Sequence, residues 1–233
     1  FTLLKHVNAG DAEPLAIFFI LLSLLIFIKS LNKQTIEKNY FNLFLFGFFI
    51  FLSISLRPNY LPTGFLFLII FSLFYYYYFK NIFLILALFF GFIFIFLIPF
   101  HNYFYGDSFT LLSSGYSHNT HVPINIYYYA FLDLLNLNWL NSEYINKILR
   151  HVAIWIKPSE YHYIITFFIL LISLVSKNSL SIKTLCMLSL SQHLVLLVFE
   201  PQGRYAYLAW ILTIIIVFHF IIKMLQNFRL YFK

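Results

Sequence analysis

The chain has 233 residues, of which 62% are hydrophobic and only 10% are charged, and its mean hydropathy is +0.85. Soluble domains typically carry about 25% charged residues, so this composition excludes an ordinary soluble domain and predicts a polytopic membrane protein. The net charge of +7 does not indicate nucleic-acid binding, because the basic residues are scattered singly at the ends of apolar runs. A single cysteine, Cys186, excludes a disulfide within the chain.

Seven apolar runs have about the length of a membrane-spanning helix. They are Pro14–Lys29, Phe41–Leu56, Leu61–Phe79, Ile82–Phe100, His162–Ser176, Ser179–Phe199 and Tyr205–Ile222. The predicted fold is therefore an all-α membrane bundle in one domain. Residues 1–100 hold four helices, residues 101–161 form a long external segment, and residues 162–233 hold three helices and a cytoplasmic tail.

The basic residues predict the orientation of the bundle, because Lys and Arg accumulate in short cytoplasmic loops. One set of loops carries Lys29, Lys33, Lys38, Lys80, Lys177, Lys183, Lys223, Arg229 and Lys233. The short loops of the other set carry Lys5, Arg57 and Arg204. We therefore expect the N-terminus to lie outside and the C-terminus to lie in the cytoplasm.

The external side also carries most of the groups that could do chemistry. All the acidic residues except Glu37, and all the histidines except His193 and His219, fall on that side. Acidic residues avoid the cytoplasmic side weakly in any case, but this concentration favours a functional external face.

The long external segment divides in two. A spanning helix is expected to break at Pro99 into a polar loop, His101–Asn125, which is rich in Gly, Ser, Asn and His. Ile126–Trp155 is amphipathic and is expected to form a helix that lies in the membrane interface.

Two arginines lie at the external mouths of apolar helices. Arg204 stands in Glu200-Pro201-Gln202-Gly203-Arg204-Tyr205, and Arg57 stands in Leu56-Arg57-Pro58. A guanidinium in this position could bind the phosphate of a membrane lipid in bidentate fashion. It could equally anchor a helix end by reaching the lipid headgroups. The sequence does not distinguish these two interpretations.

Several acidic and imidazole groups are candidate ligands or bases. Asp11 and Glu13, just before the first apolar run, could hold a divalent cation, supply a general base or stabilise the start of a helix. His118 and His121 have a spacing found in metal sites but lack a firm third ligand, so the metal requirement stays unknown. His193, inside an apolar run, is either a site residue or an imidazole bonded to a neighbouring helix.

The order of these motifs resembles a known family. They are Gly10-Asp11-Ala12-Glu13-Pro14, Leu56-Arg57-Pro58, Pro99-Phe100-His101-Asn102-Tyr103 with Gly106, and Glu200-Pro201-Gln202-Gly203-Arg204-Tyr205. The chain resembles the C-terminal two-thirds of polytopic GT-C glycosyltransferases, in particular the bacterial relatives of protein mannosyltransferases and aminoarabinose transferases. The resemblance implies an enzyme of the bacterial inner (plasma) membrane. Such an enzyme transfers a sugar from a polyprenyl-phosphate donor to a lipid, glycan or protein acceptor on the external face.

The motifs and the resemblance together predict three groups of site residues: catalytic carboxylates, ligands of the donor phosphate, and residues of a loop over the site. The catalytic carboxylates are Asp11 and Glu13, and the phosphate ligands are Arg204, Tyr205 and Arg57. The residues of the loop over the site are His101, Asn102 and Asp107. His101 stands where many relatives have an arginine.

The family's catalytic acidic residue follows its first membrane helix, whereas this chain begins at Phe1 without a Met or a signal peptide. We therefore expect a C-terminal fragment, inactive alone if that residue precedes it. Alternatives are an O-antigen ligase or polymerase, a transporter or flippase, and a non-catalytic membrane scaffold.

Overall fold

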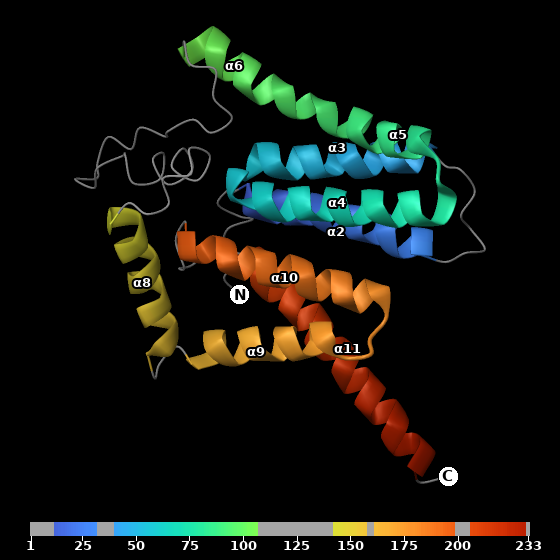
Figure 1. The fold of residues 1–233 in the computed structure, drawn as a ribbon, viewed down its shortest axis with the longest axis vertical. Coiled ribbons are helices and arrows are strands. Elements are labelled where there is room, and N and C mark those ends of the chain that lie inside the picture. Colours follow the sequence, from blue (N-terminus) through green and yellow to red (C-terminus); the bar gives the residue numbers. More distant parts are fainter. Residues whose placement is uncertain (1–11, 32–39, 107–141, 158–160, 199–205, 232–233) are drawn as a thin grey trace.

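The computed structural model describes residues 12–31, 40–106, 142–157, 161–198 and 206–231, and every regular element in these ranges is a helix (Figure 1). Five helical stretches are long and apolar enough to cross a membrane: Glu13–Leu31, Leu61–Phe79, Ile82–Tyr105, Leu180–Leu197 and Tyr207–Gln226. Two more of the expected spans, Tyr40–Leu56 and His162–Val175, are apolar helices of less than spanning length. The predicted all-α fold is confirmed for the described residues, the apolar helices match a membrane protein, and the number of seven spans stays a prediction.

The first half of the bundle is built around phenylalanine rings. Helices α2 (Glu13–Leu31), α3 (Tyr40–Leu56) and α4 (Leu61–Phe79) lie side by side and alternate in direction (Figure 1). Phe46 of α3 meets Phe71 of α4 with ring centroids 4.3 Å apart, and Phe27 of α2 meets Phe71 at 5.1 Å, both edge to face. Edge-to-face pairs add about 0.5–1.5 kcal/mol each beyond the apolar area that they bury.

Helix α5 (Ile82–Phe92) packs very closely on α3 at two glycines. A Cβ atom on Gly47 would lie 2.1 Å from the carbonyl oxygen of Leu88, and a Cβ atom on Gly91 would lie 2.0 Å from that of Phe44. Membrane helices use small residues in this way to bring their backbones together. No larger residue fits at either position without separating the helices.

The chain continues as a helix through Pro99, so the predicted break at this residue is wrong. A short 3₁₀ segment, η3 (Ile93–Phe96), follows α5 and leads directly into α6 (Leu97–Gly106). Pro99 is the third residue of α6, and the first turn of an α-helix has backbone N–H groups that need no partner within the helix. The proline is tolerated there, and His101 lies on a helix instead of opening a loop.

The second half contains α8 (Ser142–Ile156), α9 (Tyr161–Val175), α10 (Leu180–Val198) and α11 (Tyr207–Tyr231). Helix α10 packs against α4 and joins the two halves, while α8 stands steeply across the ends of α9 and α10 (Figure 1). The structure describes the expected amphipathic segment from Ser142 onward and makes that part a helix, whereas residues 126–141 lie outside the described ranges.

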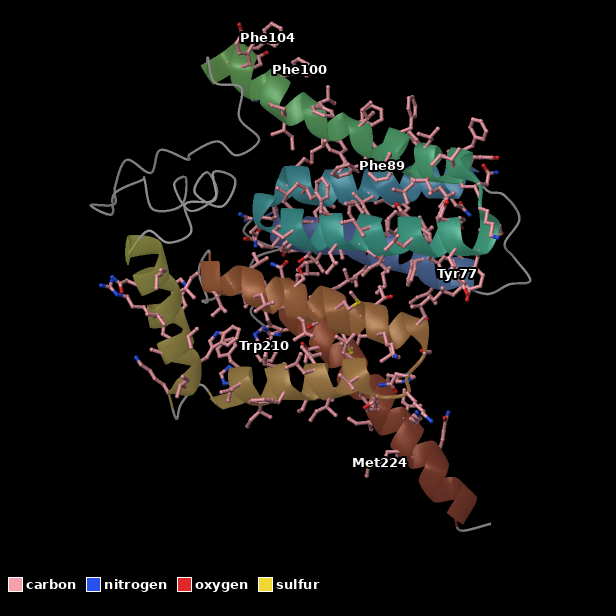
Figure 2. All side chains as sticks on the ribbon, in the orientation of Figure 1. Tyr77, Phe89, Phe100, Phe104, Trp210 and Met224 are labelled. Atoms are coloured by element: carbon pink, nitrogen blue, oxygen red, sulfur yellow. The ribbon has the colours of Figure 1, made fainter. Side chains whose placement is uncertain are left out.

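Large apolar side chains cover the outer surface of the bundle. Phe89 and Phe100 of the α5–α6 stretch and Met224 of α11 are among these exposed side chains (Figure 2). Water-soluble proteins rarely expose apolar patches of this extent, so these faces match a lipid environment.

One end of the bundle gathers the buried polar groups described below. We call it the Glu13 end: it is the end where α2 and α4 begin and where α3 and α10 finish. In Figure 1 it is the left-hand end of these helices.

Candidate functional site

An ion pair between Glu13 and Arg57 joins α2 to α3 at the Glu13 end. The Glu13 side chain is 1% exposed and that of Arg57 is 20% exposed. Glu13 lies in the first turn of α2, and Arg57 follows the last turn of α3, where acidic and basic groups respectively stabilise the helix dipole. Because α2 and α3 run in opposite directions, these two favourable positions meet. Ser53 reinforces the contact by donating a hydrogen bond to the Ala16 carbonyl at 2.9 Å.

Tyr60 fills the space beside this ion pair. It ends the short 3₁₀ turn η2 (Pro58–Tyr60), and its N–H donates to the Arg57 carbonyl at 3.0 Å. The side chain is fully buried, and its hydroxyl has no hydrogen-bond partner among the described residues. Burial raises the pKa of Tyr60, and the negative charge of Glu13 raises it further, against a smaller opposing effect of Arg57. Tyr60 is therefore a neutral phenol that can donate one hydrogen bond.

A second polar contact joins α4 to α10 one helical turn further along. Thr63 donates a hydrogen bond to Gln192 Oε1 at 2.8 Å and lies 3.3 Å from the Ser191 hydroxyl. Gln192 is fully buried, and its Nε2 has no partner in the described part of the chain. Since Thr63 follows Tyr60 by three residues, both side chains belong to the same end of α4.

The Glu13 end holds three buried hydrogen-bond donors near the buried carboxylate of Glu13. Arg57 Nε, Tyr60 Oη and Gln192 Nε2 are buried, carry hydrogen atoms and lack an acceptor among the described residues. A buried donor left without an acceptor costs about 1–3 kcal/mol, so three at one end of the bundle indicate a place for an acceptor-rich group. An anionic oxygen ligand such as a phosphate would satisfy them and would also interact with the Arg57 charge.

A separate hydrogen-bonded cluster holds α10 and α11 together. Thr213 lies 2.9 Å from the Ser189 hydroxyl and 3.3 Å from His193 Nε2, and it donates to the Ala209 carbonyl at 2.8 Å. The ring of Trp210 packs edge-on against His193 with centroids 5.3 Å apart. Of the two interpretations of His193, the structure supports an imidazole that is hydrogen-bonded to the neighbouring helix α11.

The predicted site residues fall into two sets. The structure brings Glu13 and Arg57 together as a pair in which Glu13 is buried and Arg57 is partly exposed. It places His101 on the exposed helix α6, with its ring 4.8 Å from that of Tyr105, where α6 turns away from the bundle (Figure 1). Within the described part, His101 is therefore not beside the Glu13–Arg57 pair. Outside that part lie Asp11, Asp107, Arg204 and Tyr205, as well as the side chain of Asn102.

Tyr60, Thr63 and Gln192 were missed by sequence reasoning. Thr63 and Gln192 are polar residues inside apolar runs, which is a usable signal. Tyr60 carried no such signal, because the chain has 18 tyrosines and nothing in the sequence distinguishes this one. The described residues contain no group of three His, Cys, Asp or Glu side chains that could hold a metal ion. His118 and His121 lie outside those residues.

Comparison with protein families, with curated proteins and with solved structures finds no match for this chain.

Proposed function

We propose that this chain is part of an integral membrane glycosyltransferase that uses a polyprenyl-phosphate-linked sugar as its donor. The supporting observation is the Glu13–Arg57 pair, which has the unpartnered donors Tyr60 Oη and Gln192 Nε2 at the same end of the bundle. This arrangement offers a carboxylate for proton transfer and several donors for a phosphate, within a structure whose outer face suits a lipid tail.

In the resting site Arg57 and Glu13 neutralise each other. A donor phosphate competes with the carboxylate for the guanidinium, because Arg binds phosphate and carboxylate oxygens with the same planar geometry. Tyr60 and Gln192 then donate hydrogen bonds to the remaining phosphate oxygens. Phosphate binding thereby releases the Glu13 carboxylate from its partner and makes it available as a base.

The transfer step follows from this exchange. The acceptor hydroxyl oxygen attacks the anomeric carbon of the sugar as the bond from that carbon to the phosphate oxygen breaks. The phosphate leaves with the bonding electron pair and stays bound to Arg57, which stabilises its growing negative charge. The hydroxyl proton passes to Glu13 as general base.

We place the site on the external face, as the distribution of basic residues predicts. A transporter would instead require ionisable groups at mid-depth along several helices. His193, a candidate for such a role, is occupied by its contacts with Thr213 and Trp210. The glycosyltransferase is therefore the better-supported proposal.

The binding step is tested with the full-length protein in detergent micelles. Polyprenyl phosphate and the polyprenol of the same length are titrated separately, and bound lipid is measured by native mass spectrometry. Arg57→Gln should weaken polyprenyl phosphate binding by about ten- to a hundredfold, the range of a hydrogen bond to a charged group. Polyprenol binding should not change, because the alcohol has no anionic oxygens.

Lys80→Gln is the matched control, since it removes one exposed positive charge at the opposite end of the bundle. It should leave the binding of both lipids unchanged. The proposal fails if Arg57→Gln leaves polyprenyl phosphate binding intact, or if it weakens the binding of both lipids equally.

A further inference from the structure

Helix α8 differs from the other helices in its orientation. It stands across the ends of α9 and α10, whereas those helices run along the bundle (Figure 1). If the bundle spans a membrane, α8 therefore lies near the membrane surface and roughly along its plane. This position exposes one side of the helix to headgroups and water.

One face of α8 is fixed to the bundle. Trp155 is buried and stacks on Tyr163 of α9 with ring centroids 5.8 Å apart and nearly parallel planes. His151 Nδ1 forms a hydrogen bond with the Leu197 carbonyl near the end of α10. The spacing of these two residues, i and i+4, places both on the same side of the helix.

The free surface of α8 carries an apolar stripe and a basic stripe. Leu149 and Ile156 are 58% and 54% exposed, and Ile145 continues the same line. At about 100° per residue these three lie within roughly 40° of one another, and the exposed Arg150 lies roughly 100° further round. Lys157, which is also exposed, directly follows the last residue of the helix. Residues 142–157 contain three basic residues, Lys147, Arg150 and Lys157, and one acidic residue, Glu143.

We propose that α8 is an interfacial helix that binds the anionic phospholipids of the surrounding membrane. The Ile145–Leu149–Ile156 stripe enters the acyl-chain boundary, while Arg150 and Lys157 contact phosphate-bearing headgroups beside it. Apolar and basic stripes side by side are the pattern by which helices lie on anionic bilayers. This inference concerns the lipid around the protein and does not depend on the proposed glycosyltransferase activity.

A lipid surface fits this face better than a protein partner does. The apolar stripe alone would suit either occupant, but the basic stripe next to it favours an anionic partner at the depth of the membrane surface. Each Lys or Arg near an anionic membrane surface strengthens association about fivefold. An anionic headgroup meets the charge and the depth requirement together.

The test measures which lipids surround α8 in the full-length protein. A Cys186→Ser background removes the buried cysteine, and Ala153→Cys carries a fluorophore at an exposed position between the two stripes. The protein is placed in vesicles of phosphatidylcholine with a minor fraction of phosphatidylglycerol. Quenching by trace phosphatidylglycerol with a nitroxide on its acyl chain is compared with quenching by the same amount of labelled phosphatidylcholine.

Labelled phosphatidylglycerol should quench about fivefold more than labelled phosphatidylcholine, and Arg150→Gln/Lys157→Gln should abolish most of this preference. The charge-preserving control Arg150→Lys/Lys157→Arg should retain it. A fluorophore on Asn178→Cys, in the turn between α9 and α10 at the opposite end, should not respond to either double variant.

Three outcomes would overturn the proposal. One is equal quenching by the two lipids in the parent protein, and another is an unchanged preference in the glutamine variant. The third is a Leu149→Cys label that neither lipid quenches but that cross-links two copies of the chain, which would make the apolar stripe a dimer contact.

Discussion

Glu13 and Arg57 are 44 positions apart, yet each occupies the position in its own helix where its charge is favourable. The negative charge lies at the start of α2 and the positive charge at the end of α3. Truncating one partner of a buried pair costs about 3–5 kcal/mol, because the other charge remains buried without compensation. A phosphate that replaces the carboxylate keeps the Arg57 guanidinium compensated, while the released Glu13 carboxylate needs the acceptor hydroxyl as its new partner.

Tyr60 provides a prediction about pH dependence. Burial and the charge of Glu13 raise its pKa, so the hydroxyl stays protonated and able to donate well above neutral pH. Tyr60→Phe should weaken polyprenyl phosphate binding by about tenfold. The loss should be constant from about pH 6 to about pH 10, because the deprotonated form is not populated in that range. A titration of native-mass-spectrometry binding at several pH values checks this, and a loss that disappears toward high pH would contradict it.

The carboxylate and the arginine were foreseen individually from the sequence, but their contact was not. Helix-end charges are visible in a hydropathy profile, and their common side follows from topology. Which charge pairs with which depends on helix packing, and the sequence alone does not specify packing. Residues 1–11 and 199–205 lie outside the described ranges, so the predicted place of Asp11 and Arg204 in one site with Arg57 stays a prediction.

Among the elements, the α3–α5 pair depends most on single residues. A Cβ atom on Gly91 would meet the backbone oxygen and carbon of Phe44, and a Cβ atom on Gly47 would meet the backbone of Leu88. Gly64 is different, because its nearest atoms are the side-chain ends of Ile54 and Ile50 at 2.9 and 3.0 Å. Backbone atoms cannot move without shifting a whole helix, whereas side-chain ends can change rotamer.

Gly91→Ala should therefore destabilise the bundle by about 1–3 kcal/mol, the usual range for overpacking. Gly64→Ala is the matched control and should have a smaller effect. The free energy of unfolding in mixed detergent micelles measures both changes. Equal stability of Gly91→Ala and the parent would show that α3 and α5 are not in backbone contact.

The apolar runs of the sequence predict where the helices lie, but not where each one ends. Each predicted run corresponds to a helix in the structure, since a stretch of apolar residues in lipid must satisfy its backbone internally. The predicted end of the fourth run is wrong, because Pro99 does not break the helix. The 3₁₀ segment Ile93–Phe96 shifts the start of the following helix so that Pro99 falls in its first turn. That local change of helix type has no signature in the uniformly apolar sequence around it.

At the scale of the whole molecule, α4 and α10 join the two halves, and their buried hydrogen bond involves Thr63 and Gln192. The ion pair, Tyr60 and this contact all occur at the Glu13 end. The asymmetry of basic residues predicts that this end faces outward.

Cysteine labelling tests that orientation. In a Cys186→Ser background, Asn146→Cys on α8 should react with a membrane-impermeant maleimide in intact cells. Lys177→Cys, exposed at the opposite end of the bundle, should react only after permeabilisation. The reverse labelling pattern would place the Glu13 end in the cytoplasm and would remove the external donor site.

In the proposed mechanism Arg57 binds a lipid phosphate while Glu13 acts on the acceptor. The most direct measurement compares Glu13→Gln with Arg57→Gln in the full-length protein, for polyprenyl phosphate binding and for transfer of sugar from a polyprenyl-phosphate donor. Glu13→Gln should bind polyprenyl phosphate at least as tightly as the parent, because Arg57 loses its competing carboxylate. It should lose transfer by about a hundredfold or more, as expected for removal of a general base. Arg57→Gln should lose both polyprenyl phosphate binding and sugar transfer. Parental transfer by Glu13→Gln, or a loss of binding as large as that of Arg57→Gln, would make the pair a purely structural contact.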